Sequence, residues 1–465
     1  LLIVGVIVIT AQVADKQTAK RESSYTSVIE EPLADVITKD KAARASIMKR
    51  QRALLAERYD TTARTTTDVT MSRGKPLPVG PTAKLKGVTW TQLAEMTPEE
   101  IKGKNIFPYL PLPHPNHPVG GMVFPQMSID SFSRLQRFDL DFDLPEHFLP
   151  EFPPALFLTT HKDLGDVSQG KVITVDNYYD LFNGLLNPKQ IEGLRLLVTQ
   201  FPQQQFNNTA DRKTEKPSLG VSCMDCHVNG HTNGATHLVG DIRPQANRNR
   251  IETPSLRGVN VQRLFGSQRA LKTVEDFTEF EQRAAYFDGD HLTAAKKGVN
   301  PLERGSQVHF MSEFQALLDF PPAPKLDIFG QLIPSKASAS ELRGEILFYG
   351  KAKCVSCHTP PYFTDNQMHD LQVERFYTPQ TINGQYIRAE GPIKSFVLRG
   401  IKDSPPYLHD GRLLTLEDVV EFFNLIDQTK LTGEEKKDLV AFLRQLKCHP
   451  WISMKKSIKQ KAVTW

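Results

Sequence analysis

Two short stretches of the chain decide its fold: Cys223-Met-Asp-Cys226-His227 and Cys354-Val-Ser-Cys357-His358. In each stretch two thiols stand about one helical turn apart, and a histidine follows directly. In this pattern two thiols add to the vinyl groups of one haem, and the adjacent histidine lies under the iron. We therefore predict two covalently bound haem c groups. The predicted attachment residues and proximal iron ligands are Cys223, Cys226, His227, Cys354, Cys357 and His358.

Two other uses of paired cysteines compete with this interpretation. A structural zinc site needs four closed ligands, and the two thiol pairs together supply four. Zinc, however, does not explain a histidine directly after each pair. A redox dithiol would belong to a strand–helix unit, which the surrounding sequence does not predict. The repeated motif therefore favours haem over both alternatives.

The composition is that of an ordinary soluble globular protein. The chain has 465 residues, 39% hydrophobic and 24% charged, and its length is enough for two or three domains. The net charge of +4 is too small to indicate nucleic-acid binding, although it fits contact with a small redox protein that is acidic. The two motifs use four of the five cysteines, so Cys448 is left over and no disulfide framework is indicated.

The amino-terminal part of the chain differs from the rest. Residues 1–14 join an apolar run to small residues, as in the later part of a secretory signal peptide, so we expect export, for example to the periplasm. Residues 15–160 form an extension with a basic helix at 41–59 and a proline-rich, largely irregular belt at 105–155. We expect the helix to pack on the body; contact with a membrane surface or a protein partner is the alternative.

A block of sequence after the first haem motif recurs after the second. LRGVNVQRLFGSQRALKTVEDFTEF begins at Leu256 and LRGIKDSPPYLHDGRLLTLEDVVEFF begins at Leu398, and they align without gaps at an offset of 142 (398 − 256). In each copy a threonine precedes acidic residues, a pattern typical of a helix N-terminus. Two further helices are expected to start near Asn187 and Ser338, ahead of the two motifs.

The repeat predicts the fold class and the division of the chain. We expect a mainly α protein with two tandem cytochrome c-like helical haem domains, behind a proline-rich and largely irregular amino-terminal extension. The predicted haem domains span 161–335 and 336–447, and residues 448–465 form a carboxy-terminal tail. The sequence leaves the oligomeric state open.

Several motifs of the second half recur in a known order. They are Arg343-Gly344, Leu347-Phe348, the second haem motif, Phe363-Thr-Asp365, Met368-His369-Asp370-Leu371, Leu398-Arg399-Gly400, Pro406-Tyr-Leu-His409-Asp410-Gly411-Arg412, Thr415-Leu-Glu-Asp418 and Leu439-Val-Ala-Phe-Leu443. With them, residues 185–447 resemble the bacterial di-haem cytochrome c peroxidase superfamily, which includes the di-haem enzyme that matures tryptophan tryptophylquinone.

The resemblance carries functional implications. Electrons would enter at the carboxy-terminal haem and pass to the amino-terminal one, where peroxide is cleaved. A calcium ion would lie between the haems, with Glu252 at a place where the family has Asn and with backbone carbonyls from Ser404 and Pro406. Oxygen ligands with a carboxylate suit Ca²⁺. The alternative is that Glu252 pairs with a nearby arginine.

The sequence also departs from the family pattern. Phe423 falls where the family places a Met or Tyr ligand to the carboxy-terminal haem, and phenylalanine cannot bind iron. The family's inter-haem tryptophan is replaced by Gly266 in the stretch Phe265–Arg269. His409 is present in the second repeat, whereas Ser267 stands at its place in the first. His409 is therefore a candidate catalytic residue, or alternatively a structural hydrogen-bonding group.

The remaining site predictions concern distal groups. The candidate distal ligands are His231 and His237 for the first iron, and Met368 and His369, with His409, for the second. The candidate distal acids are Glu275 and Glu279, with Glu281 nearby, although their spacing is also that of a solvated helix face.

These observations favour a di-haem peroxidase-like oxidoreductase that reduces peroxide or an activated oxygen species. An oxidase that acts on a protein or organic substrate is a second form of the same class. The alternatives are a non-enzymatic di-haem electron carrier and a structural or docking subunit of a larger complex. An iron with an open position separates the enzyme from the carrier.

Overall fold

The computed structural model describes residues 33–114, 122–136, 140–141, 143–200, 221–237, 250–285, 300–379, 381–382, 385–386 and 390–446. The signal-like segment at 1–14, Cys448 and the predicted tail lie outside these ranges. The described chain is mainly helical, as predicted. Its α-helices are α1 (Leu33–Arg58), α2 (Trp90–Glu95), α3 (Pro98–Lys104), α4 (Gln126–Ser131), α5 (Tyr178–Phe182), α6 (Pro188–Val198), α7 (Cys223–Cys226), α8 (Val274–Ala285), α10 (Pro301–Gln315), α11 (Ala339–Tyr349), α12 (Leu416–Ile426) and α13 (Gly433–Leu443).

The strands are short and belong to small sheets. They are β1 (Thr65–Thr70), β2 (Pro76–Pro78), β3 (Met122–Phe124), β4 (Leu140–Asp141), β5 (Thr236–His237), β6 (Ile251–Glu252), β7 (Met368–His369), β8 (Thr381–Ile382), β9 (Gln385–Tyr386) and β10 (Ile393–Lys394). β1 pairs with β2, β7 with β10 and β8 with β9, while the fourth sheet has the order β4-β3-β5-β6.

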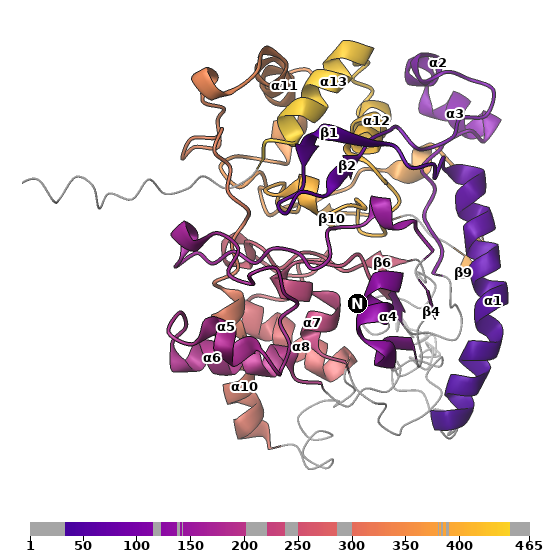
Figure 1. Ribbon diagram of the computed structural model, residues 1–465. Helices are drawn as coiled ribbons and strands as arrows, with labels where there is room; N and C mark the ends of the chain where they lie inside the picture. The colour runs from indigo at the N-terminus through magenta and orange to yellow at the C-terminus, as the bar shows by residue number, and fades with distance from the viewer. Residues whose placement is uncertain are drawn as a thin grey trace, which may run out of the picture.

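The helices gather in two groups at opposite ends of the molecule. α5 to α8 and α10 lie at one end, α11 to α13 lie at the other, and α1 runs along one side (Figure 1). Within the first group α6 packs on α10, and within the second α11 packs on α13. A hydrophobic cluster formed by residues between 156 and 318 fills the first group. A second cluster fills the other group and includes side chains of the extension from Met48 to Leu149.

The same local signals begin the equivalent helices of the two groups. Asn187 caps α6 in a reciprocal bond with Gln190, and Ser338 caps α11 with Glu341. Thr273 accepts from the Asp276 N–H at the start of α8, and Thr415 caps α12 with Asp418. The helix starts predicted from these polar residues are therefore confirmed, because each side chain satisfies a backbone N–H that the helix leaves unpaired.

A glycine allows the closest helix contact in each group. A Cβ atom built on Gly193 of α6 would lie 1.8 Å from the Phe310 carbonyl oxygen of α10. A Cβ atom built on Gly344 of α11 would lie 1.9 Å from the Asp438 carbonyl oxygen of α13. Only a residue without a side chain permits these two backbones to approach so closely.

The amino-terminal extension packs on the rest of the chain and has no separate core within its described part. α1 begins at Leu33, eight residues before the predicted start, and buries Met48 and Leu55, which confirms that it packs on the body. The belt is less extended than expected, since α4 and the 3₁₀ turns η1 (Ser133–Gln136) and η2 (Glu146–Phe148) interrupt it. No helix of the described chain is long and apolar enough to cross a membrane.

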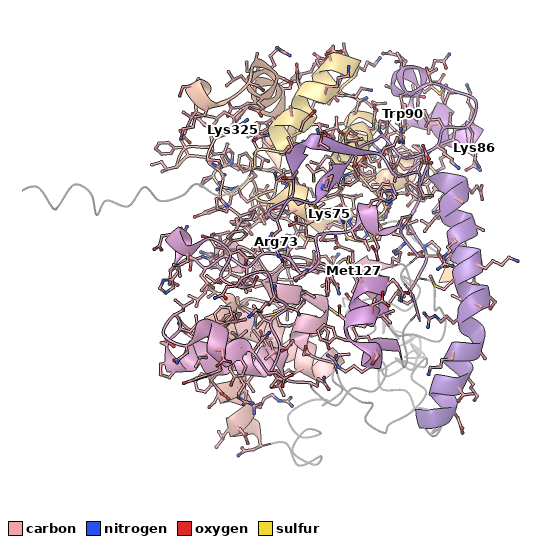
Figure 2. All side chains as sticks on the ribbon, in the orientation of Figure 1. Arg73, Lys75, Lys86, Trp90, Met127 and Lys325 are labelled. Atoms are coloured by element: carbon pink, nitrogen blue, oxygen red, sulfur yellow. The ribbon has the colours of Figure 1, made fainter. Side chains whose placement is uncertain are left out.

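Hydrogen bonds join distant parts of the extension to each other and also attach it to the last helices. Glu151 accepts backbone N–H bonds from Arg73 at 2.8 and 2.9 Å and from Lys75 at 2.8 Å. Figure 2 shows Arg73 and Lys75 in the middle of the molecule, between the two helix groups. Farther along the chain, the Thr82 N–H donates at 2.8 Å to the buried carboxylate of Asp418 at the start of α12. The extension thus contributes to the packing of the last helices.

Candidate functional site

Each of the two cysteine motifs forms a single tight turn. The first is α7, where the His227 N–H donates to the Cys223 carbonyl at 3.0 Å. The second is the 3₁₀ turn η8 (Cys354–Ser356), where the His358 N–H donates to the Cys354 carbonyl at 2.9 Å. The one-turn geometry that haem attachment requires is therefore present in both motifs.

The extension supports the first motif. Ser222 and Asp225 form a capping box at the start of α7, and Asp225 also pairs with Arg134 from η1 at 2.5 Å. Phe124, Ile129 and other apolar residues of the extension pack beside the sulfur-bearing residues of this motif. Cys354 and Val355 of the second motif pack against the larger hydrophobic cluster, which also includes residues of the belt.

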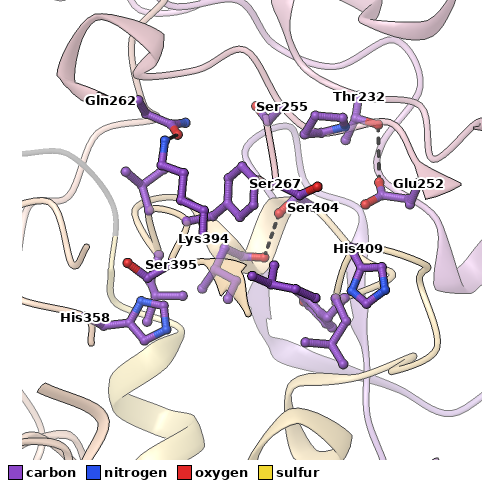
Figure 3. Close-up of a pocket in the computed structure, with 18 of the residues that line it drawn as sticks. Thr232, Glu252, Ser255, Gln262, Ser267, His358, Lys394, Ser395, Ser404 and His409 are labelled. Atoms are coloured by element: carbon purple, nitrogen blue, oxygen red, sulfur yellow. Dashed lines mark hydrogen bonds between the residues drawn. The ribbon is translucent and has the colours of Figure 1, made fainter. Parts of the chain in front are cut away.

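One continuous cavity of about 620 Å³ is lined by both motifs. Both histidines and all four cysteines contribute to its walls, with side chains from α8 and α12. Figure 3 shows this region with His358 on one side, His409 and Glu252 on the other, and Lys394 between. An elongated space shared by two such motifs is what two neighbouring prosthetic groups need.

The protonation states of the motif residues fit iron ligation. Burial lowers the pKa of His227 to about 4, against weaker hydrogen bonding to backbone at Pro254 and His231. Burial likewise lowers the pKa of His358. Both imidazoles are therefore neutral at pH 7, the form that binds a metal. The His358 ring contacts the Phe363 carbonyl through Nδ1 at 2.9 Å, and donation from that nitrogen would leave Nε2 for a metal.

The cysteines do not fit the two alternative interpretations. Burial raises the pKa of Cys354 to about 12 and also raises that of Cys357, whereas a redox dithiol needs a thiolate of low pKa. The four motif cysteines are free, and the described residues contain no cluster of three or more His, Cys, Asp or Glu side chains that could hold a metal ion. The geometry favours haem attachment over zinc.

The two repeats cross each other through equivalent residues. The Glu252 N–H donates to the His409 carbonyl at 2.9 Å, and the Lys394 N–H donates to the Ser267 carbonyl, also at 2.9 Å. Glu252 and Lys394 are equivalent at the repeat offset of 142, and so are Ser267 and His409. The same contact is therefore made twice, in opposite directions, as in a two-fold interface.

Comparison with known proteins supports the resemblance. No protein-family model matches the chain. The methylamine utilization protein MauG of Methylorubrum extorquens is 33% identical over 135 residues, which are 25% of this chain and 37% of MauG. Cytochrome-c peroxidase IdrP2 of Denitromonas iodatirespirans is 27% identical over 286 residues, which are 50% of this chain and 77% of that protein. The chain is a divergent member of the bacterial di-haem cytochrome c peroxidase superfamily.

The superfamily assignment rests on these sequence relatives. Among solved structures, the diheme peroxidase BthA of Burkholderia thailandensis is 16% identical, with a TM-score of 0.37 over 57% of this chain and 87% of that chain. A similarity this low adds nothing to the assignment. The chain matches only about a third of the length of MauG, so the match carries no information about the rest of that protein.

The candidate distal ligands of this superfamily member differ in their surroundings. His231 is buried, and its two ring nitrogens contact the Ser255 hydroxyl at 2.7 Å and the Asp403 carbonyl at 2.8 Å. These bonds hold His231 as a bridge to the second repeat and leave no nitrogen for iron. The backbone of His237 lies in β5, and its side chain lies outside the described residues.

The second iron has two further candidates, both from β7. The His369 ring lines the cavity, and its Nε2 contacts the Asp365 carboxylate at 2.8 Å. The cavity wall does not include the side chain of Met368. By strand register, His369 opposite Ile393 is equivalent to His237 opposite Ile251. Of the two β7 residues, therefore, only His369 faces the cavity.

The acids of α8 are arranged differently from the prediction. Glu275 is exposed and lies 3.9 Å from the His309 ring, and neither Glu275 nor Glu279 lines the cavity. Glu281 does line it. At the repeat offset Glu281 is equivalent to Phe423, which also lines the cavity (423 − 281 = 142). The sequence contained this signal, because the place of Phe423 was known and the repeat leads from it to Glu281.

The candidate calcium residues lie together beside His409. Burial raises the pKa of Glu252 well above its usual value, and the recorded hydrogen bond of its side chain is to Thr232, at 3.4 Å. The charge of Arg250 lowers this pKa only in part, and the guanidinium forms its ion pair with Asp143, at 2.7 Å. Gly411 lies next to both Glu252 and Pro406, and Ser404 and Pro406 line the same cavity. A buried carboxylate without a paired arginine, among backbone oxygens, fits a cation.

Proposed function

We propose that this chain is an exported di-haem c-type cytochrome with peroxidase-like activity, built from two tandem cytochrome c-like domains. Cys223, Cys226 and His227 would hold one haem, and the equivalent residues of the second motif would hold the other. Haem iron with an open position supplies the binding and reduction of peroxide or another activated oxygen species. The observation that carries this proposal is the single cavity lined by both motifs.

The two repeat-equivalent residues on α8 and α12 suggest which haem does the chemistry. Glu281 places a carboxyl group in the first half of the cavity, whereas Phe423 places an apolar ring in the second. Cleavage of an O–O bond needs a group that takes up and returns a proton, which a carboxyl group can do and a phenyl ring cannot. Peroxide would therefore react at the first motif, and electrons would enter at the second.

The other components of the proposal come from the surrounding residues. Glu252, with carbonyl groups of Ser404 and Pro406, would hold one Ca²⁺ next to His409. A small redox protein would supply the electrons, and the extension would offer a surface to a protein partner or to the face of a membrane. The signal-like run at 1–14 supports export. The tandem domains are supported by the repeat and by the two hydrophobic clusters.

The test begins with the purified full-length protein. It should contain two haem c groups per chain, and removing Cys354 and Cys357 together should leave one. A high-spin ferric signal that changes on addition of peroxide is expected. Glu281→Gln should lower kcat/KM for peroxide by about 10²–10⁴-fold with both haems retained, and Glu303→Gln on exposed α10 is the matched control.

Two results would redirect the proposal. If both irons are low-spin in the oxidised and half-reduced states, the chain is an electron carrier without an open site. If Glu275→Gln lowers activity and Glu281→Gln does not, the distal acid is Glu275, one of the two candidates predicted from the sequence, and it lies on the outer face of α8.

A further inference from the structure

Two charges of opposite sign, a half-buried carboxylate and a buried ammonium group, occupy equivalent places in the two repeats. Glu252 ends β6 and Lys394 ends β10, and the two residues are separated by the repeat offset (394 − 252 = 142). Each donates its backbone N–H across to the other repeat. Both line the cavity, yet they form no ion pair with each other among the described residues. The Glu252 carboxylate is suited to bind a cation, whereas the Lys394 ammonium group is suited to bind an anion.

The surroundings of the Lys394 ammonium group lack a carboxylate. The residue is 3% exposed, and its Nζ donates to the Gln262 amide oxygen at 3.0 Å. The rings of Phe265 and Phe396 lie 5.6 and 5.5 Å away and give partial stabilisation. Within the described part of the chain no acidic side chain makes an ion pair with it, and Arg269 adds charge of the same sign.

Three buried arginines of the molecule are arranged differently. Arg250 faces Asp143, Arg257 faces Asp403, and Arg412 faces Asp410. A buried charge without a partner is costly in a protein interior, so such cations occur with an anion beside them. Burial lowers the pKa of Lys394 to about 8, which reflects the missing negative charge. The cavity therefore offers an anion a desolvated ammonium group beside the Gln262 amide.

We propose that Lys394 is the anion-binding residue of the cavity and that the anion it holds is a haem propionate carboxylate. This inference rests on the proposed function, since a haem must be present. Lys394 belongs to the second repeat but its Nζ reaches Gln262 of the first, so either haem could supply the carboxylate. The repeat frame would thus bind a metal cation at Glu252 and a cofactor anion at Lys394.

The test measures the reduction potential of each haem in the holoprotein. A positive charge beside a haem favours the reduced state, because reduction adds an electron. Lys394→Met removes the charge and keeps an apolar stem of similar shape. We expect both haems to be retained and one potential to become more negative, by at least a tenfold change in its reduction equilibrium constant, about 59 mV for one electron. The haem whose potential moves is the one that supplies the carboxylate.

Three further variants keep the test decisive. Lys394→Arg keeps the positive charge, so both reduction potentials should stay close to those of the wild type. Lys272→Met, which removes an exposed lysine outside the cavity, should leave both potentials unchanged. Gln262→Glu puts an internal carboxylate beside Nζ and should also shift one potential negative, which covers the case in which Lys394→Met does not fold. Two bound haems with unchanged potentials in Lys394→Met or Gln262→Glu would overturn the inference. Wild-type protein without haem would instead overturn the proposed function.

Discussion

The two repeats share a frame and differ at the cavity. Each has a polar residue that caps its first helix, a glycine that lets two helices touch, and a haem motif on one turn. Among the equivalent pairs that line the cavity, three change charge or polarity in ways that bear on its chemistry: Glu252 and Lys394, Ser267 and His409, and Glu281 and Phe423. The residues that build the frame are the same in kind, whereas these three pairs differ between the repeats. We infer that the shared frame determines the fold and that the three pairs determine how the two haem sites differ in function.

The largest expected effect comes from breaking the shared frame. Gly193→Ala and Gly344→Ala should each destabilise the protein by about 1–3 kcal/mol or more, because the new methyl group meets a backbone carbonyl that cannot move aside easily. Thermal unfolding of the holoprotein, with the haem content of each variant, measures this. Equal losses in the two variants would show that the two helix pairs are equivalent in stability as well as in form.

The control for the glycine prediction is Gly305→Ala. Gly305 also lies inside a helix, α10, but a Cβ atom there would have no neighbour within 4 Å. That change should stabilise the protein by about 0.5–1 kcal/mol, since alanine suits a helix better than glycine. If Gly193→Ala behaves like Gly305→Ala, the close approach of α6 and α10 is not a constraint on this fold.

An intermediate effect is expected at the charged pair. Ca²⁺ should stabilise the wild-type holoprotein, by about 2.7 kcal/mol when its free concentration is 100 times Kd, and a chelator should reverse this. Glu252→Gln should abolish the dependence on Ca²⁺. In chelator the same variant should be at least as stable as wild type, because it removes a buried charge that has no cation beside it.

The matched control for this pair is Glu303→Gln, which removes an exposed acid of α10 and should leave the Ca²⁺ dependence unchanged. A Glu252→Gln protein that still gains the full stability from Ca²⁺ would move the cation site away from the cavity.

The smallest effect compares two equivalent helix caps. Thr415 at the start of α12 is buried and Thr273 at the start of α8 is exposed, although each accepts an N–H at 3.1 Å. Removing a cap costs about 0.5–2 kcal/mol, and we expect Thr415→Ala near the upper end and Thr273→Ala near the lower. Urea unfolding of the two variants checks the order. Equal values would mean that burial adds nothing to the cap.

Much of the frame could be predicted because its signals are local. The haem motifs occupy five consecutive residues, and the caps at Asn187, Ser338 and Thr415 act on residues three positions ahead. The repeat offset was also visible in the sequence. Helix α1 was predicted from its composition, but its start was missed by eight residues, although Pro32 and Asp35 are signals of a helix start.

Which side chains point into the cavity was harder to predict. Glu275 and Glu279 share one helix face and Glu281 lies on another, so spacing alone cannot decide which face meets the cavity. Phe277, four residues before Glu281, lines the cavity and marks the inner face. His231 was one of two candidate distal ligands, and its contact with Asp403, 172 residues away in sequence, could not be predicted from the motif. Lys394 lies four residues before the repeated block that begins at Leu398, so the motifs of that block do not point to it.

The bond between Thr82 and Asp418 has a consequence for how the chain is made. Its partners are separated by 336 residues, so Thr82 leaves the ribosome long before the carboxylate that it will bind. At a rate of synthesis of about 5–20 residues per second, the interval is roughly 20–70 s, and during it the segment around Thr82 cannot form this bond. Closing so long a loop also comes late in folding, since distant contacts carry the largest entropic cost. The bond at Thr82 thus forms only after α12 has been made, and truncation before α12 would remove this attachment of the extension.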